Sequence, residues 1–179
     1  MILSVFVHYQ RRMKCMFDIL VYLYETYYRP DTCPDSIALA KKLSDVGFDD
    51  DEIIAALDWL RGLADTTNHL AAVNLDTPLS SATLLASTGF RVYTEEENAL
   101  LGSEAIGYLH FLQDTEMLDS QQREIVIERA MAVDESPLSL AKFKVIVLMI
   151  LWSQGRESNM LMFDELLLDE NDDGSRFLQ

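Results

Sequence analysis

Apolar residues that recur at steps of three and four positions limit the possible folds of this chain more than any other feature. The first such set falls on one face of a helix and consists of Phe17, Leu20, Val21, Tyr24 and Tyr28. The same spacing returns along most of the chain, so we predict a mainly α-helical protein. The segments predicted to be helical are 17–28, 35–46, 49–64, 94–112, 119–133, 138–153 and 162–167.

Local sequence signals mark several of the predicted helix ends. Gly47 follows the second helix, where a glycine in the left-handed conformation commonly ends a helix. Thr94 and Glu97 have the spacing of a capping box, in which hydroxyl and carboxylate each accept a hydrogen bond from a backbone N–H group. In the third helix, Ile53, Leu57, Leu60 and Ala64 are predicted to form the buried stripe.

Residues 66–89 contain a single charged residue, Asp76, and a structureless loop of this length is uncommon inside a compact domain. We predict a small β-hairpin there, formed by 70–75 and 90–93 and joined by a long loop. Three helices followed by a hairpin is the element order of a winged helix. The predicted organisation is a leader (1–15), a winged-helix-like half (16–94), a C-terminal helical bundle (95–168) and an acidic tail (169–179).

The charge balance restricts the partners. The chain has 14 basic and 30 acidic residues and a formal net charge of −16, and all three charged residues among the first 15 are basic. Such a surface repels nucleic acids and anionic lipids and favours a basic partner protein. In a winged helix the third helix enters the DNA groove, yet here it begins with acidic residues, so direct nucleic-acid binding is disfavoured.

An acidic and aromatic surface is the binding site that we predict. Tyr22 lies off the buried stripe of the first helix, and an aromatic side chain rimmed by carboxylates is typical of protein-binding surfaces. The predicted protein-binding patch consists of Tyr22, Asp49, Asp50, Asp51 and Glu52.

The apolar segments and the cysteines of the sequence indicate the cellular compartment of the protein. The longest apolar run, Val145–Trp152, has 8 residues, whereas a membrane-spanning helix needs about 20. Met1–Val7 is apolar and precedes the basic residues, which reverses the order of a signal peptide. Cys15 and Cys33 have no disulfide-framework spacing. We expect a cytoplasmic protein without membrane association.

Three motifs that could support chemistry are better explained by structure. Residues 169–174 match the first half of an EF-hand loop, but the glutamate of its twelfth position would fall beyond the last residue. Ser139 and Lys142 have the S-x-x-K spacing of penicillin-interacting enzymes, but the accompanying motifs are absent, so we interpret Ser139 as a helix cap. His8, His69 and His110 form no metal-binding motif, and we interpret His110 as an ordinary helical histidine. We predict no catalytic residue, no metal and no cofactor.

Short matches in a fixed order relate this chain to a known family. They begin with Met16-Phe17-Asp18 and Leu23-Tyr24-Glu25-Thr26-Tyr27, and continue through Ala56-Leu57-Asp58-Trp59-Leu60, Arg91-Val92-Tyr93-Thr94, Val126-Ile127-Glu128-Arg129 and Glu165-Leu166-Leu167. This pattern resembles the bacterial Smg family, a domain of unknown function, from Met16 to about Asp169. The resemblance implies no catalytic residues. Because the first 15 residues lie outside it, we expect Met16 to be the physiological start, which N-terminal mass spectrometry would test.

Two functional hypotheses remain from the sequence. The first is a non-enzymatic regulatory or binding module whose acidic surface docks a basic protein. The second is a winged-helix factor that acts in nucleic-acid processing through a protein complex. The oligomeric state is open under both hypotheses.

Overall fold

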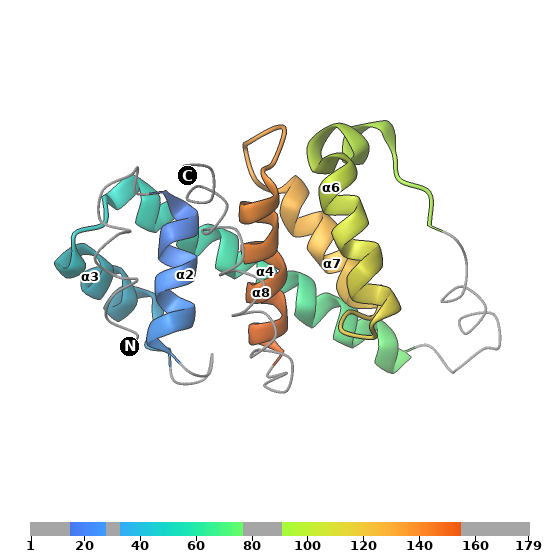
Figure 1. Ribbon diagram of the computed structural model, residues 1–179. Helices are drawn as coiled ribbons and strands as arrows, with labels where there is room; N and C mark the ends of the chain where they lie inside the picture. Colours follow the sequence, from blue (N-terminus) through green and yellow to red (C-terminus); the bar gives the residue numbers. More distant parts are fainter. Residues whose placement is uncertain (1–14, 28–32, 77–90, 155–179) are drawn as a thin grey trace, which may run out of the picture. The chain divides into compact units, whose positions relative to one another are not determined.

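The computed structural model describes residues 15–27, 33–76 and 91–154, with side chains described up to Asn68 in the second range, and consists there of six α-helices (Figure 1). They are α2 (Met16–Thr26), α3 (Ser36–Val46), α4 (Asp50–Asp76), α6 (Glu95–Asp114), α7 (Ser120–Met131) and α8 (Leu140–Ser153). The chain forms two compact units, residues 1–58 and 59–179, whose boundary falls within α4. The predicted division after residue 94 stays a prediction.

The mainly α-helical prediction holds, but the predicted β-hairpin is wrong. Leu70–Leu75 belongs to α4, which continues to Asp76, and residues 91–94 are not a strand. No strand is present in the described ranges, and residues 77–90 lie outside them. Once a helix is nucleated, each added residue contributes a hydrogen bond, and Leu70, Ala71 and Ala72 are good helix formers. The hairpin prediction gave the shortage of charge more weight than this propensity.

The sequence signals located several helix ends correctly. Gly47 caps α3 in the left-handed conformation, with φ of 99°. Thr94 and Glu97 form the predicted capping box, in which the N–H of Glu97 donates to Thr94 Oγ1 (3.2 Å) and the N–H of Thr94 donates to Glu97 Oε2 (2.8 Å). The Ser139 side chain caps α8 by accepting a hydrogen bond from the N–H of Lys142.

Helix α6 is interrupted after its second turn. Gly102 has φ of 69° and ψ of 174°, values outside the helical region, so the residues before and after it form two helical segments. A positive φ is strained for a residue with a Cβ atom, which explains a glycine here. The interruption was not predicted from the sequence.

The first unit contains α2, α3 and the first turns of α4. Ile19, Leu20 and Leu23 of α2 and Leu43 of α3 are fully buried. On α4 the buried side chains of this unit are Ile53 and Ala56. The predicted stripe of the third helix is therefore only partly right, because Leu57 and Leu60 are half-buried and Ala64 is exposed.

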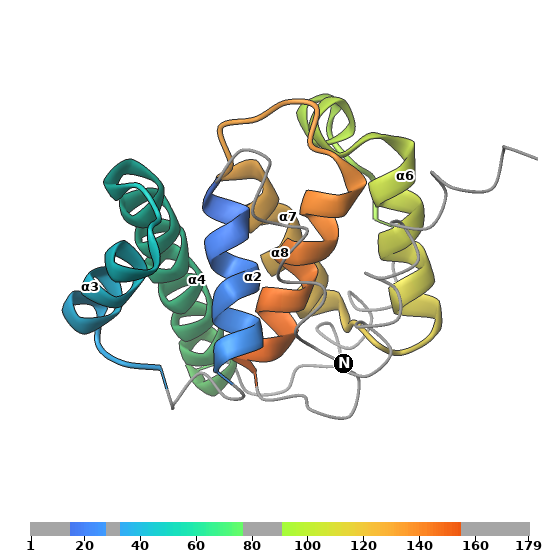
Figure 2. The ribbon, with the colours of Figure 1, turned by 60° about the vertical axis from the view of Figure 1, so that its left-hand side comes forward.

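In the second unit α6, α7 and α8 pack against one another (Figures 1 and 2). Every residue of α8 from Phe143 to Trp152 is buried, as expected for a helix that is apolar nearly all round. The α4 segment of this unit contacts α7, because Trp59 Nε1 donates to the carbonyl oxygen of Arg129 (3.1 Å). A Cβ atom on Gly62 would lie 2.0 Å from Arg129 Nη1, so a glycine makes room for that guanidinium. No helix among the described residues is long and apolar enough to span a membrane.

Candidate protein-binding surface

Tyr22 and the acidic run at the start of α4 are brought together by Phe48. The rings of Tyr22 and Phe48 pack edge to face, with centroids 5.8 Å apart and planes at 63°. Phe48 directly precedes Asp49, and both aromatic residues are half-buried. Tyr22 therefore contacts the residue next to the acidic run, although it is more enclosed than the sequence suggested. That these residues form a protein-binding patch stays a prediction.

The acidic residues of the patch lie at the start of α4, with Asp49 just before the helix and Asp50, Asp51 and Glu52 in its first turn. Asp49, Asp50 and Asp51 are exposed, and Glu52 is partly buried. Glu52 Oε2 accepts a hydrogen bond from the N–H of Asp49 (3.2 Å), which satisfies one of the backbone donors that a helix start leaves unpaired. Within the described residues, none of these four carboxylates has a cationic partner.

The first unit, residues 1–58, contains ten acidic and six basic residues. Two of the basic residues, Lys41 and Lys42, lie in the described ranges. One of the two, Lys42, donates a hydrogen bond to the Tyr27 hydroxyl (3.1 Å) and lies 5.0 Å from the centre of that ring. This hydrogen bond raises the pKa of Lys42 above its usual value. Lys42 is therefore engaged with α2.

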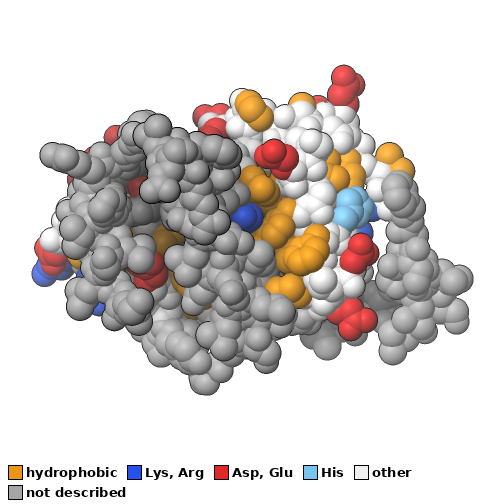
Figure 3. Space-filling view, in the orientation of Figure 1, with side chains coloured by type: hydrophobic (Ala, Val, Ile, Leu, Met, Phe, Trp, Pro, Cys, Tyr) orange, Lys and Arg blue, Asp and Glu red, His pale blue; other side chains and the backbone are white. Residues whose placement is uncertain are grey.

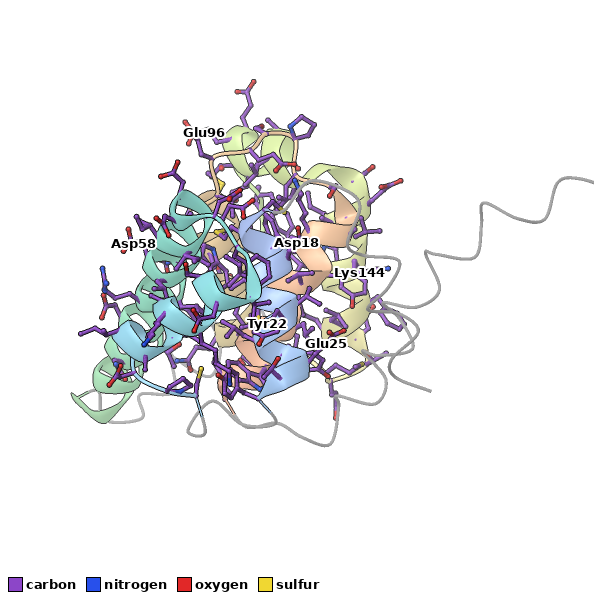
Figure 4. The ribbon with its side chains drawn as sticks, turned by 90° about the vertical axis from the view of Figure 1, so that its left-hand side faces the viewer. Asp18, Tyr22, Glu25, Asp58, Glu96 and Lys144 are labelled. Atoms are coloured by element: carbon purple, nitrogen blue, oxygen red, sulfur yellow. The ribbon has the colours of Figure 1, made fainter. Side chains whose placement is uncertain are left out.

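Along α2, acidic residues flank Tyr22 on both sides (Figure 4). Asp18 precedes it by one helical turn, and Glu25 follows at a spacing of three, which places the three side chains on one face. Asp18 also caps α2, because its Oδ2 atom accepts the N–H of Cys15 (2.8 Å). Carboxylates thus lie near Tyr22 along α2 as well as at the start of α4.

Sequence reasoning missed Ile54, whose exposed fraction is 58 %. It lies on α4 between Asp50, four positions before it, and Asp58, four positions after it. A helical projection that placed Ala56 and Trp59 in the buried stripe would have found Ile54 on the opposite side. The adjacent Ile53, which is buried, concealed this signal.

In the second unit, basic side chains form ion pairs with acidic side chains of the same unit. Arg91 forms two 2.7 Å hydrogen bonds with the carboxylate of Glu97 and also binds Glu124 on α7 at 3.0 Å. Its guanidinium lies 4.7 Å from the centre of the Tyr93 ring. The bonds from Arg91 lower the pKa of Glu97 to about 2, although burial of the carboxyl opposes the shift. This network ties the residues before α6 to α7, so we assign it to the fold.

A second surface of this unit is aromatic. Figure 3 shows hydrophobic side chains gathered on the face where α6 and α8 lie. Phe111 is 48 % exposed and stacks on Tyr108, with ring centroids 6.5 Å apart, and the Nζ atom of the buried Lys144 lies 5.7 Å from the centre of the Tyr108 ring. These contacts occupy the Tyr108 ring within the chain, and no described contact indicates a ligand.

The other sequence motifs add no site. Ser139 is the cap of α8, as predicted, and Lys142 forms an ion pair with Glu135. His110 is half-buried against the edge of Tyr93, with ring centroids 6.0 Å apart. Residues 169–174, the partial EF-hand loop, lie outside the described ranges. No group of three or more potential metal ligands occurs among the described residues.

Comparison with known proteins identifies relatives for nearly the whole chain. The model of the family described as protein of unknown function (DUF494) matches residues 16–175. Proteins named Protein Smg homolog are similar in Herminiimonas arsenicoxydans, with 55 % identity over 91 % of this chain and 99 % of the relative, and in Bordetella pertussis, with 48 % identity over the same shares. The relative from Aromatoleum aromaticum is 47 % identical over 92 % of this chain and its own full length. No solved structure matches.

Proposed function

We propose, on the premise that this chain belongs to the bacterial Smg family of proteins of unknown function, that it is a non-enzymatic binding module with an acidic docking surface. The docking surface consists of Asp49 to Glu52 at the start of α4, of which the three aspartates are exposed, and the Tyr22 and Phe48 rings beside them. Its partner is a protein surface rich in lysine and arginine. The observation that carries the proposal is that none of the four α4 carboxylates has a cationic partner among the described residues.

Electrostatics favours such a partner in two ways. Exposed carboxylates attract a basic surface over roughly 8 Å at physiological salt, so the charge accelerates encounter more than it tightens the final complex. Neighbouring aromatic and apolar side chains supply the area from which water is expelled on binding. A surface of this kind predicts complexes whose association rate falls as salt concentration rises.

The test compares two variants that change the net charge equally. In the first, Asp49, Asp50 and Asp51 become Asn, which removes three charges from the docking surface. In the matched control, Glu95, Glu96 and Glu104 become Gln, which removes three charges from exposed positions of α6 in the second unit. Wild type and both variants are used for affinity purification from cells, and the partner that is recovered is then purified and titrated at low and high salt.

The expected result is that the control keeps the partner of the wild type and the Asp variant loses it. For the purified pair, each neutralised carboxylate should weaken binding by about threefold, a value in the range of partly exposed ion pairs. An equal loss of binding in both variants would mean that the net charge of the whole chain, and not this surface, determines binding. A partner with an acidic surface would also contradict the proposal.

The winged-helix alternative has less support. Its hairpin does not exist where it was predicted, because residues 70–75 are helical. Three exposed aspartates would also lie at the start of its DNA-reading helix, Asp49 just before it and Asp50 and Asp51 within it. A gel shift with the purified full chain and duplex DNA at low salt separates the two hypotheses, since a retarded band would favour the alternative.

A further inference from the structure

Helices α6 and α8 present a face on which aromatic rings lie around an ammonium group. The Tyr108 ring of α6 packs edge to face on the buried Phe143 of α8, with centroids 6.5 Å apart, and also stacks on Phe111. Lys144 lies on the side of α8 turned towards α6, with Nζ 5.7 Å from the centre of the Tyr108 ring (Figure 4). Lys144 is only 8 % exposed, so this face holds a cation in largely apolar surroundings. We call Tyr108, Phe111 and Lys144 the α6/α8 face.

One side of the α6/α8 face has room for a further segment. Phe111 is 48 % exposed, and Gly107, four positions before it, is exposed as well. Residues four apart lie on one side of a helix, and a Cβ atom on Gly107 would meet nothing within 4 Å. A single exposed ring is common on protein surfaces, but this one stacks on the ring that a buried cation approaches. Apolar side chains suit the rings, and a carboxylate suits the ammonium group.

The C-terminal segment 160–170 carries both kinds of group. It lies outside the described ranges, and its sequence predicts a helix at 162–167. The apolar stripe of this predicted helix consists of Met162, Phe163, Leu166 and Leu167. Glu165 and Asp169 are four positions apart, and Asp169 follows Met162 by seven, so both carboxylates border the stripe when the helix continues to 169. The segment therefore combines an apolar side with an acidic edge.

The chain after α8 is long enough to return to this face. Lys144 lies nine positions before Ser153, the last residue of α8, which is about 14 Å along the helix axis. Seven residues, 155–161, separate Gln154 from Met162. Connections between packed helices commonly have about 2–8 residues. A helix that runs back from Met162 covers about 10 Å by Asp169, so its acidic edge comes within side-chain reach of Lys144.

We infer that segment 160–170 binds across the α6/α8 face, with its apolar stripe on the aromatic rings and one of its two bordering carboxylates beside Lys144. The segment is then a strap that shields the rings from water and joins the end of the chain to the second unit. Removal of apolar surface from water supplies most of the attraction, and the ion pair fixes the register of the strap. This inference is independent of the proposed function, which concerns the first unit.

Two other occupants fit the α6/α8 face less well. The basic protein proposed as the partner of the first unit would bring like charge against Lys144. A second copy of the chain could supply the same segment, but two chains with a formal net charge of −16 each repel one another. A strap from the same chain meets neither obstacle.

Photocrosslinking of the purified full chain tests this placement. Benzoylphenylalanine replaces Phe111, an aromatic residue of the α6/α8 face, and in a matched control it replaces Val92, a 78 % exposed apolar residue of the same unit. After irradiation at low protein concentration, mass spectrometry determines whether an adduct contains one chain or two and which peptides it joins.

The expected result is an adduct within one chain that joins position 111 to residues 160–168, with no such adduct from position 92. Absence of an adduct from position 111, an adduct with another segment, an adduct of two chains, or the same adduct from position 92 would overturn the inference.

A carbodiimide tests the ion pair in the unmodified chain, because it joins an ammonium and a carboxylate in contact as an amide, with loss of water. Lys142 and Glu135 form an ion pair in the second unit, so their crosslink is the internal positive control. We expect a second crosslink, from Lys144 to Glu165 or Asp169. If the Lys142 crosslink forms and Lys144 joins neither carboxylate, the assignment of the ion pair is wrong.

Two double variants test whether the stripe makes the contact. Phe163→Ser with Leu166→Ser removes apolar groups from the stripe, and Leu161→Ser with Leu168→Ser makes a matched change on the opposite side of the predicted helix. The first should lower the yield of the position-111 adduct about tenfold and the second by less than about twofold. An equal Lys142–Glu135 crosslink in all proteins shows that the second unit stays folded. Equal adduct yields in the two double variants would overturn the inference.

Discussion

The two compact units differ in how their charges are paired. By sequence, residues 1–58 contain ten acidic and six basic residues, a net charge of −4, and residues 59–179 contain twenty acidic and eight basic residues, a net charge of −12. In the second unit Arg91, Arg123 and Arg129 all form ion pairs with glutamates. In the first, the acidic start of α4 has no cationic partner within the described residues. Net charge alone therefore does not distinguish a structural role from a binding role.

The placement of the basic residues makes this difference. Arg91 reaches Glu97, six positions away, and Glu124, 33 positions away, so its charge joins segments that the fold must bring together. The two basic residues described in the first unit are consecutive, Lys41 and Lys42 on α3, and Lys42 donates to Tyr27. Among the described residues of this unit, no cation forms an ion pair with the start of α4.

Among the changes that test this comparison, Arg91→Ala should have the largest effect on stability. It removes the partner of Glu97 and Glu124 together and leaves two carboxylates near each other, so the second unit should lose about 2 kcal/mol of stability. Trp59 and Trp152 both belong to this unit, so tryptophan fluorescence during urea unfolding reports on it directly.

Lys41→Ala is the matched change in the first unit. Lys41 is exposed, and its substitution should alter hydrogen exchange in α3 by less than about 0.5 kcal/mol. If Lys41→Ala were as costly as Arg91→Ala, the charges of the two units would play the same role.

Acidification should remove a large part of the stabilisation that the ion pair of Arg91 and Glu97 gives the second unit. The pKa of Glu97 is lowered to about 2 by Arg91, from an ordinary value of 4.5. A lowered folded-state pKa means that the stabilisation is present above pH 4.5 and is lost as the pH falls from 4.5 towards 2. Glu97→Gln should therefore cost about 1.5 kcal/mol at pH 7 and almost nothing near pH 2. Urea unfolding followed by tryptophan fluorescence at several pH values measures both. If the difference in unfolding free energy between the wild type and Glu97→Gln were the same at every pH, the acid sensitivity would come from groups other than Glu97.

Helix ends were predictable because their signals are local. The Thr94 and Glu97 capping box, the Gly47 cap and the Ser139 cap each depend on a side chain and a backbone group within a few residues. The hairpin prediction failed because it gave the shortage of charge in residues 66–76 more weight than the helix propensity of Leu70, Ala71 and Ala72, through which α4 continues. The interruption at Gly102 was not recognisable, since an isolated glycine is compatible with a continuous helix.

The candidate surface was predictable in part. The acidic run and Tyr22 are visible in the sequence, and their connection through Phe48 is a tertiary contact that no spacing reveals. Ile54 required knowledge of which face of α4 is buried, and that depends on Ala56 and Trp59. The Arg91 network was hidden for a similar reason, because Glu124 lies on another helix.

The smallest effect should follow from neutralising the acidic start of α4. In the double variant Asp50→Asn and Asp51→Asn, two opposing contributions change together. Carboxylates near a helix N-terminus each stabilise it by roughly 0.3–1 kcal/mol, and adjacent like charges repel one another. The net change in the stability of the first unit should stay within about 0.5 kcal/mol.

Asp35→Ala provides the control within the same unit. The Asp35 carboxylate accepts the N–H of Ala38 at 2.8 Å, so its loss should cost about 1 kcal/mol. Hydrogen exchange of α3 and α4 peptides, measured by mass spectrometry, compares the two variants under one condition. A loss of more than about 1 kcal/mol in the double variant would mean that these aspartates serve the fold, as the ion pairs of the second unit do, and would remove the contrast on which the docking surface depends. A negligible loss, together with loss of the partner, would show that this unit tolerates unpaired charge at a position where binding uses it.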